Sequence, residues 1–333
     1  MNCNYCERKC ALGGSNTGYC GMYVLKNGQV TEKYPDHWSS YHATNIESIP
    51  FYHAFPNSRS MHLGSFSCNL NCHYCINAYV ARGNPEDIYP VVMPAEKMVE
   101  KTVQSKSDTI IFGVNEVTVS LPSALRVAKA AKAEGIPVGC LTNAYMTEEA
   151  TESMVEDMEF FNISLKSLKS PFYRKYAEID GVEPILRNIK TIAKNRHVEI
   201  TTPIVENVND DEIMEIAAFI RDINPEIPWH VFRLLPEYKM ENIENPDIEK
   251  INKRLKEARE ILPNIYFANF IGSEWVSTRC PDCGYNVIER ITLGSCGAKL
   301  IKYELENGNC PNCGKRISIY GGYVDRTTVE VGA

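Results

Sequence analysis

Three cysteines within eight residues constrain this chain more than any other feature of its sequence. Cys68, Cys72 and Cys75 stand in a C-x3-C-x2-C spacing, and no fourth cysteine lies nearby in the sequence. Three thiolates at this spacing can ligate three irons of a cubane 4Fe-4S cluster and leave the fourth iron open. A closed structural site uses four protein ligands, so an open iron indicates a cluster that binds a substrate or cofactor. The alternative is a zinc loop that takes a ligand from elsewhere in the chain.

Size and charge narrow the class of protein. The 333 residues, 44% of them hydrophobic, suffice for one large α/β domain with small appendages. A formal net charge of -7 argues against a nucleic-acid partner, because binding phosphates needs a basic surface. No apolar run is long enough to span a bilayer, and the N-terminus lacks a signal-peptide pattern. We therefore expect a cytoplasmic protein with no membrane partner.

A second cysteine group occupies the first twenty residues. The spacings favour metal binding over disulfides, and we call this group the head site: Cys3, Cys6, Cys10 and Cys20. Zinc and iron, alone or in an iron-sulfur cluster, all accept four thiolates, so the spacing leaves the metal open with a slight preference for zinc. An iron-sulfur cluster there could relay electrons. The isolated Cys140 lies in an apolar run and is expected to be a buried small hydrophobe.

A third group lies near the C-terminus, where two C-x2-C-G knuckles are separated by strand-like segments. This pattern predicts a zinc ribbon, and we call its ligands the ribbon site: Cys280, Cys283, Cys310 and Cys313. An iron site can use the same four thiolates, so the metal is zinc or iron. Cys296 lies between the knuckles and has no assigned role.

From residue 61 onward, apolar strand-like runs alternate with helical periodicity, which predicts an α/β fold with a parallel sheet of six βα units. The predicted strands are 61–66, 109–112, 137–141, 160–165, 197–204 and 229–234, with a last strand in 264–270. The predicted helices are 95–105, 120–134, 147–157, 182–194, 209–223 and 246–262. Residues 22–60 are predicted to be a connector with one hairpin at 23–33. The predicted domains are 1–60, 61–277 and 278–333.

Tyr74 immediately precedes the last cysteine of the C-x3-C-x2-C group. A C-x3-C-x-aromatic-C motif resembles that of the radical S-adenosylmethionine (SAM) superfamily. The resemblance implies a partial (βα)6 TIM-like barrel, a 4Fe-4S cluster and SAM bound to the open iron. It also implies reductive cleavage of SAM to methionine and a 5'-deoxyadenosyl radical, which abstracts hydrogen from a protein, peptide or small-molecule substrate. A reductant such as ferredoxin or flavodoxin is then a partner.

The order of motifs along the chain resembles one group more narrowly. A C-x2-C-x3-C start with a later cysteine among glycines is followed by a Pro- and His-containing stretch, the SAM motif, and Pro228-Trp229-His230. This order is similar to that of the radical SAM component of the AmmeMemoRadiSam system, which is related to glycyl-radical-enzyme activating enzymes. The C-terminal knuckles fit the same resemblance.

Polar residues follow the predicted strands at the end where such barrels bind their ligands. The resemblance implies a cofactor-binding set composed of Tyr74, Asn115, Glu116, Asn143, Ser164, Lys166 and Arg233. Two positions depart from the motifs of related enzymes, because Val117 replaces a proline and Ser164 replaces an acidic residue. His230 has two readings, a packed and hydrogen-bonded core residue or a ligand-binding ring, and the first is slightly favoured.

Two classes of function remain at this point. The first is a radical SAM enzyme, with activation of a glycyl-radical enzyme as one alternative within it. The second is a non-catalytic iron-sulfur and zinc protein that serves as a scaffold or electron carrier. An unligated iron beside strand-end SAM motifs favours the enzyme, because a carrier needs no open iron. Neither the substrate nor a catalytic residue follows from the sequence.

Overall fold

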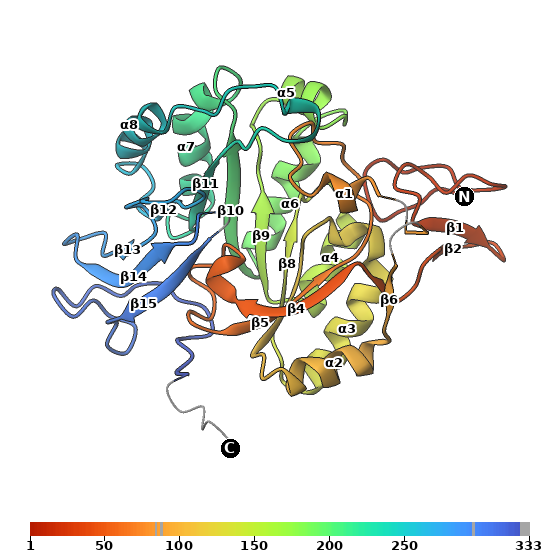
Figure 1. The fold of residues 1–333 in the computed structure, drawn as a ribbon, viewed down its shortest axis with the longest axis horizontal. Helices are drawn as coiled ribbons and strands as arrows, with labels where there is room; N and C mark the ends of the chain where they lie inside the picture. Colours follow the sequence, from red (N-terminus) through yellow and green to blue (C-terminus); the bar gives the residue numbers. More distant parts are fainter. Residues whose placement is uncertain (84, 87–88, 295–296, 327–333) are drawn as a thin grey trace. The chain divides into compact units, whose positions relative to one another are not determined.

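The computed structural model describes residues 1–83, 85–86, 89–294 and 297–326. It has an α/β fold with a central, mostly parallel sheet (Figure 1). The chain divides into two compact units. The first comprises Met1–Ala43, Met61–Val198 and Leu234–Asn245, and the second comprises Thr44–Ser60, Glu199–Arg233 and Pro246–Ala333. Cys296 lies outside the described residues, and the predicted domain boundaries stay a prediction.

Parallel strands form the centre of the first unit. Their order is β9-β8-β7-β5, and the strands are β5 (Arg59–Gly64), β7 (Thr109–Phe112), β8 (Val138–Thr142) and β9 (Phe160–Ser164). All four residues of β7 are buried, as expected of a parallel strand covered on both faces. In β8, Gly139 is required by close packing, because a Cβ there would lie 2.4 Å from the Phe160 ring.

Amphipathic helices connect these strands: α2 (Ala95–Gln104), α3 (Leu121–Ala133), α4 (Glu148–Asp157) and α6 (Glu183–Ala193). Each packs against the next along the chain, as Figure 1 shows for α2, α3 and α4. α6 buries Ile185, Ile189 and Ile192 at helical spacing. The Thr147 side chain caps α4 by accepting the Ala150 amide.

The first unit also contains short elements. The predicted hairpin is confirmed as β1 (Tyr23–Lys26) and β2 (Gln29–Glu32), joined by Asn27-Gly28 with both φ angles positive, as a type I′ turn requires. The prediction of a plain connector for the rest of 22–60 is wrong. That segment includes β3 (His37–Trp38), which pairs with β6 (Val91–Val92), and also β4 (Ser40–Asn45), while η1 (Ile46–Ser48) belongs to the second unit. β4 is polar and has no buried residue, so it carries no hydrophobic pattern.

Two short helices were not predicted, α1 (Ala78–Ala81) and α5 (Ser170–Tyr176). α5 has a proline in its first turn and spans seven residues, too few for a clear helical period. Short 3₁₀ turns complete the described elements: η2 (Val117–Ser120), η3 (Asp210–Glu212) and η4 (Tyr238–Met240).

The second unit has its own parallel strands, β10 (His197–Ile204), β11 (Trp229–Arg233) and β12 (Ile265–Phe267). α7 (Ile213–Ile223) and α8 (Ile248–Ala258) pack on each other, and Asp247 caps α8. The antiparallel strands β13 (Thr278–Arg279), β14 (Asn286–Thr292) and β15 (Ala298–Tyr303) form a separate sheet beside the C-terminal knuckles.

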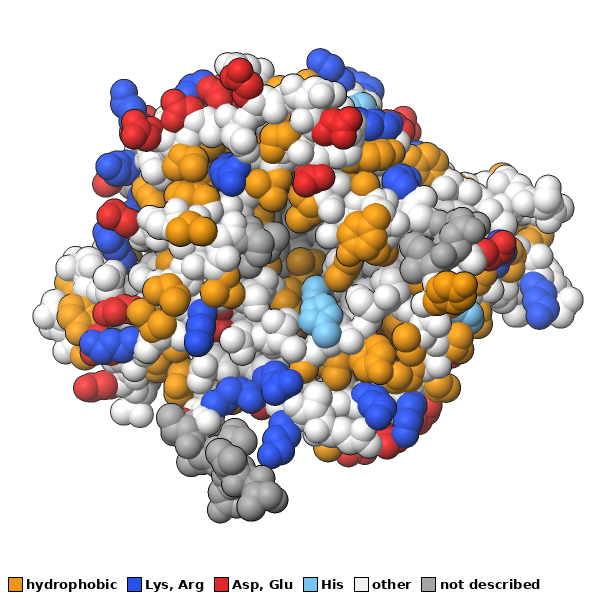
Figure 2. All heavy atoms as spheres, in the orientation of Figure 1, with side chains coloured by type: hydrophobic (Ala, Val, Ile, Leu, Met, Phe, Trp, Pro, Cys, Tyr) orange, Lys and Arg blue, Asp and Glu red, His pale blue; other side chains and the backbone are white. Residues whose placement is uncertain are grey.

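Every predicted strand and long helix is confirmed as an element of the predicted type; β7 and β10 have the predicted ends, and the ends of the others are shifted. No strand pairing among the described residues closes the sheet into a barrel, so the partial barrel stays a prediction. None of the helices in the described part of the chain is both long and apolar enough to cross a membrane. On the face shown in Figure 2, basic and acidic side chains are interspersed.

Candidate functional site

The three motif cysteines lie in one loop that begins at the C-terminal end of β5. We call residues 65–77 the cysteine loop. Ser67, with a φ of 66°, turns the chain out of the strand, and its amide donates to Val80 O at 3.1 Å. The side chains of Cys68, Cys72 and Cys75 are partly buried. One loop therefore presents all three thiols at the strand end, where parallel-sheet enzymes bind their ligands.

Backbone hydrogen bonds from outside the loop fix its middle. The Asn71 amide donates to Ala177 O at 3.0 Å, and the His73 amide donates to Tyr176 O at 2.9 Å. The His73 carbonyl in turn accepts the Lys239 amide at 2.9 Å. The unpredicted helix α5 and its C-terminal turn thus support the loop.

Arg82 fixes the start of the loop. Its Nη2 donates to Cys68 O at 2.9 Å and to Leu70 O at 2.7 Å. These are charge-assisted hydrogen bonds, which are stronger than neutral ones. No sequence motif marked Arg82, because its role depends on carbonyl groups twelve and fourteen residues earlier in the chain.

The electrostatics favour thiolates bound to a cationic centre. Burial raises the pKa of Cys68, Cys72 and Cys75, so free thiols are favoured without a cluster. The positive charges of Lys166 and Arg82 oppose this rise at Cys72 and Cys75. Because iron binding requires deprotonated sulfur, these cations lower the cost of forming the metal-bound state.

Tyr74 is buried within the cysteine loop. Its ring centroid lies 6.3 Å from that of Phe172 in α5. Among the described residues its hydroxyl has no hydrogen-bond partner. The aromatic position of the motif therefore packs the loop onto α5, and its predicted contact with a cofactor stays a prediction.

Asn115 and Glu116 follow β7, and both make internal hydrogen bonds. Asn115 Oδ1 accepts the Ser65 amide at 2.9 Å, and its Nδ2 donates to Ser67 O at 2.9 Å. The buried Glu116 carboxylate accepts the Thr142 hydroxyl at 2.8 Å, the Asn143 amide at 2.7 Å, and both the amide and the hydroxyl of Thr118. Asn115 ties β7 to the cysteine loop, and Glu116 ties it to the end of β8.

Asn143 contacts the cysteine loop directly. Its Nδ2 donates to Asn69 Oδ1 at 2.8 Å and lies 3.8 Å from Cys68 Sγ. Its Oδ1 accepts the Tyr145 amide at 2.9 Å. The end of β8 is therefore part of the immediate surroundings of Cys68.

Ser164 and Lys166 stand at the end of β9. Ser164 is half-buried and Lys166 is buried. The Lys166 amide donates to the Tyr173 hydroxyl at 3.0 Å, and its charge acts on Cys72 and Cys75. The structure thus brings Asn115, Glu116, Asn143 and Lys166 to the cysteine loop, while their predicted contacts with SAM stay predictions.

The second unit contains the remaining predicted residue, Arg233, at the end of β11. The Arg233 amide donates to Asn269 Oδ1 at 2.9 Å, and Asn269 Nδ2 donates to the Arg233 carbonyl at 2.7 Å. The packed reading of His230 is confirmed, because its Nε2 bonds to Glu199 Oε2 at 2.5 Å and both side chains are fully buried. Glu199, which sequence reasoning missed, also accepts the amides of Tyr52 and His53.

The ribbon site has the geometry of a site for a single ion. Its four sulfurs lie within 4.8 Å of one another, with Cys280 and Cys313 3.5 Å apart and Cys283 and Cys310 3.7 Å apart. A tetrahedral ion with sulfur bonds of about 2.3 Å places its ligands about 3.8 Å apart. Hydrogen bonding, first from the Asn312 side chain, lowers the pKa of Cys283 to about 6 and favours its thiolate. The predicted four-cysteine site is therefore present, and zinc or iron fits it.

Comparison with known families identifies one stretch of the chain that matches a superfamily. Residues 64–220 match the Radical SAM superfamily. This stretch is a radical SAM domain. The matched residues include the cysteine loop and the ends of β7, β8 and β9, so the chain carries the catalytic domain of an enzyme superfamily.

Relatives of the radical SAM domain have varied names. MJ0808, an uncharacterized protein of Methanocaldococcus jannaschii, is 29% identical over 96% of this chain and 95% of its own length. A putative glycyl-radical enzyme activating enzyme of the same organism is 27% identical over 50% of this chain and 71% of its own. A probable GTP 3',8-cyclase of Thermococcus kodakarensis is 25% identical over 46% of this chain, which spans about half of that relative.

Solved structures share the fold of the radical SAM domain. SuiB of Streptococcus suis, bound to precursor peptide SuiA, matches with a TM-score of 0.50 at 14% identity, over 65% of this chain and 48% of that one. A radical SAM methyltransferase from Sphaerobacter thermophilus matches with a TM-score of 0.50 at 13% identity, over 75% and 71% of the two chains. At these identities the likeness concerns the fold alone.

The superfamily implies a 4Fe-4S cluster and SAM, and the residues present fit both. The cysteine loop offers three thiols, and residues 65–77 contain no fourth cysteine. Asn143 and Lys166 add a polar amide and a cation beside these thiols. Cys68, Cys72 and Cys75 would hold three irons, which leaves one iron for the SAM amino and carboxylate groups.

Proposed function

We propose that this protein is a radical SAM enzyme that cleaves SAM reductively and abstracts hydrogen from a protein or peptide substrate. The observation that supports this most is the cysteine loop at the end of β5, surrounded by polar residues from the ends of β7, β8 and β9. When bound, the cluster would supply one electron that cleaves the sulfonium of SAM, and the cleavage would yield an organic radical. The protein's own residues must place, charge and shield that chemistry.

Each strand end has a distinct part in the proposal. Asn115 and Arg82 hold the cysteine loop in one shape through its backbone. Glu116 orients Asn143, whose amide faces Cys68. Lys166 favours the thiolate forms of Cys72 and Cys75. Tyr74 and α5 cover the loop with apolar surface, which excludes water and strengthens the electrostatic interactions beneath.

A protein substrate is favoured by the resemblance to the AmmeMemoRadiSam component, which rests on the order of the head site, the cysteine loop and the ribbon site. One alternative has a specific observation behind it. The similarity to a putative glycyl-radical enzyme activating enzyme extends over 71% of that relative. Activation of a glycyl-radical enzyme is itself hydrogen abstraction from a protein backbone, so it is a special case of the proposed reaction.

The proposal is tested by electron paramagnetic resonance of the anaerobically reconstituted protein, reduced with dithionite. The reduced 4Fe-4S signal should change when SAM is added, because SAM ligates the open iron, and 5'-deoxyadenosine should form slowly. Replacing Cys68, Cys72 and Cys75 with alanine should abolish both results. Cys140→Ala is the matched control, since Cys140 is fully buried in β8 and should leave both results unchanged. A loop-cluster signal indifferent to SAM would exclude the enzyme and favour the scaffold or carrier.

A further inference from the structure

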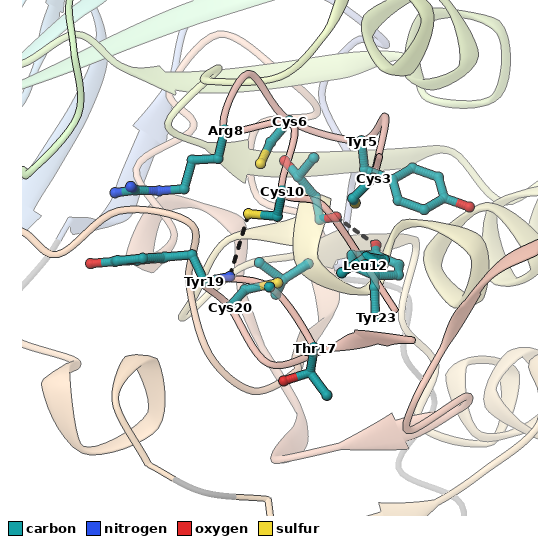
Figure 3. A pocket seen from close by; sticks show the side chains of 13 residues that line it. Cys3, Tyr5, Cys6, Arg8, Cys10, Leu12, Thr17, Tyr19, Cys20 and Tyr23 are labelled. Atoms are coloured by element: carbon teal, nitrogen blue, oxygen red, sulfur yellow. Dashed lines mark hydrogen bonds between the residues drawn. The ribbon is translucent and has the colours of Figure 1, made fainter. Parts of the chain in front are cut away.

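The head site is a set of four cysteines that has no part in the proposed function. Its four cysteines line one pocket in the first unit, together with Tyr5, Arg8 and Tyr19 (Figure 3). Figure 3 shows the sulfurs of Cys6, Cys10 and Cys20 directed toward the same space. Four thiols around one pocket form a complete ligand set without any residue of the cysteine loop.

The spacing of the head sulfurs differs from that of the ribbon site. The ribbon is the one place in the described part of the chain where at least three such ligand atoms lie within 4.8 Å of one another. The head cysteines are all described, so they are more widely spread, as are Cys68, Cys72 and Cys75. A cubane cluster binds each thiolate to a different iron, so it needs wider spacing than one tetrahedral ion. The head site therefore matches the cysteine loop and not the ribbon.

Apolar side chains enclose one side of the head site. Leu12, Met22, Tyr23 and Val119 are buried and pack in one cluster with Cys3. The Tyr5 and Tyr23 rings stack at 4.5 Å. A hydrophobic shell limits solvent access and sets the local dielectric, and through it the reduction potential of an iron-sulfur centre.

Two short connections join the head site to the cysteine loop. The Ser67 hydroxyl donates to Cys20 O at 2.7 Å, and Ser67 is followed directly by Cys68. Asn69 directly follows Cys68, and its carbonyl accepts Arg8 Nε at 2.5 Å, where Arg8 lies between Cys6 and Cys10 in the sequence. The Ser67 connection consists of one hydrogen bond and one peptide unit, whose Cα atoms are about 3.8 Å apart.

Arg8 lies between the same two sets. Its Nε donates to Asn69 O at 2.5 Å, and its guanidinium lies 3.5 Å from the centre of the Tyr19 ring. The Tyr19 amide in turn donates to Cys10 Sγ at 3.4 Å. Both cysteine sets become anionic when they bind metal, so a fixed guanidinium between them reduces their mutual repulsion.

We propose that the head site binds a 4Fe-4S cluster and passes electrons to the cluster of the cysteine loop. This inference rests on the proposed function. A low-potential one-electron donor of the ferredoxin or flavodoxin class is oxidised as the head cluster goes from the 2+ to the 1+ state. The head cluster returns to 2+ as the loop cluster becomes 1+. That electron enters the sulfonium of SAM, where one carbon-sulfur bond breaks to give methionine and the 5'-deoxyadenosyl radical.

Metal and sulfide analysis tests the identity of the head cluster. The Cys68→Ala, Cys72→Ala, Cys75→Ala variant keeps every head residue, and after anaerobic reconstitution it should contain about four irons and four sulfides besides the metal of the ribbon site. Adding Cys10→Ser and Cys20→Ser should remove them. Zinc without sulfide in the triple variant would overturn the proposal. Because this variant keeps the complete head set, the measurement does not depend on the stability of a head variant.

Reduction kinetics and magnetic coupling test the relay. In the fully reduced wild type, two paramagnetic clusters this close should broaden each other's resonance, whereas Cys10→Ser, Cys20→Ser protein should give one unbroadened signal. Stopped-flow reduction of the loop cluster by flavodoxin hydroquinone should slow at least tenfold in that variant, with Cys140→Ala as the control. An unchanged rate or an uncoupled wild-type spectrum would overturn the relay. Failure of the proposed function is distinguishable, because the loop signal of the head variant would then ignore SAM.

Discussion

Replacing Glu116 with glutamine should lower the free energy of unfolding more than the same change would at a residue that contacts only SAM. The Glu116 carboxylate accepts hydrogen bonds from Thr118, Thr142 and Asn143, and it is buried. Glu116 Oε1 accepts from Thr118 and Thr142, and Oε2 accepts from the Asn143 amide. In Glu116→Gln, the NH2 group that replaces Oε2 leaves the Asn143 amide without an acceptor. Hydrogen bonds to a charged group contribute about 1.5–3 kcal/mol each, and the bonds that remain become neutral and weaker. We expect a loss of about 3–5 kcal/mol in the free energy of unfolding.

The assay is urea unfolding of the anaerobically reconstituted variant, combined with SAM titration by paramagnetic resonance. Thr142→Val is the matched control, since it leaves the carboxylate intact and removes only the hydroxyl that donates to Glu116 and accepts the Ala144 amide, and it should cost about 1–3 kcal/mol. Both SAM affinity and stability should fall in Glu116→Gln, because Asn143 loses its support next to Cys68. A stability change below about 1 kcal/mol together with lost SAM affinity would refute the positioning role and make Glu116 a direct ligand.

Three further outcomes are expected. Burial lowers the pKa of His62 to about 3, so this side chain stays neutral in the folded state while the unfolded chain takes up a proton below about pH 6.5. As the pH falls from 8 to 5, the free energy of unfolding of the wild type, measured with urea, should therefore fall by about 2 kcal/mol. His62→Gln should remove this pH dependence, and equal pH profiles of the two proteins would contradict the prediction. Replacing Cys283 and Cys310 with serine should remove one metal equivalent by elemental analysis without altering the response of the loop cluster to SAM, and loss of that response would show that the two sites are coupled. Gly139→Ala should cost about 1–3 kcal/mol, because its Cβ meets the Phe160 ring, and Phe160→Leu should restore part of that stability; no rescue would contradict the steric cause.

The sequence predicts the elements whose signal is local. β7 and β10 are found with their predicted ends, because both are rich in β-branched residues. β4 and α5 are missed, because one is polar with no buried residue and the other spans seven residues. Spacing alone also identifies the ribbon site, since metal ligation requires particular residue types at short separations, while cluster ligation by the cysteine loop stays a prediction.

The sequence does not predict which polar groups meet. Asn115 and Glu116 were expected to bind a cofactor, and the structure shows their hydrogen bonds directed at the protein itself. The contact between Arg8 and Asn69 joins residues that are 61 positions apart, so no local pattern could reveal it. Arg82 was missed for a related reason, because its partners are backbone carbonyls, which every residue has.

The way the cysteine loop is held has a consequence for how the protein matures. The bonds that fix it run from Arg82, α5 and Lys239 to backbone atoms, and they do not depend on iron. Bonds that use no sulfur can form without a cluster, so they lower the cost of ordering the loop that cluster binding must otherwise meet. A cluster carrier would meet a prepared receptor in the folded apoprotein. Delivery of iron and sulfide can then follow folding of the chain, and a damaged cluster can be replaced without unfolding the protein around it.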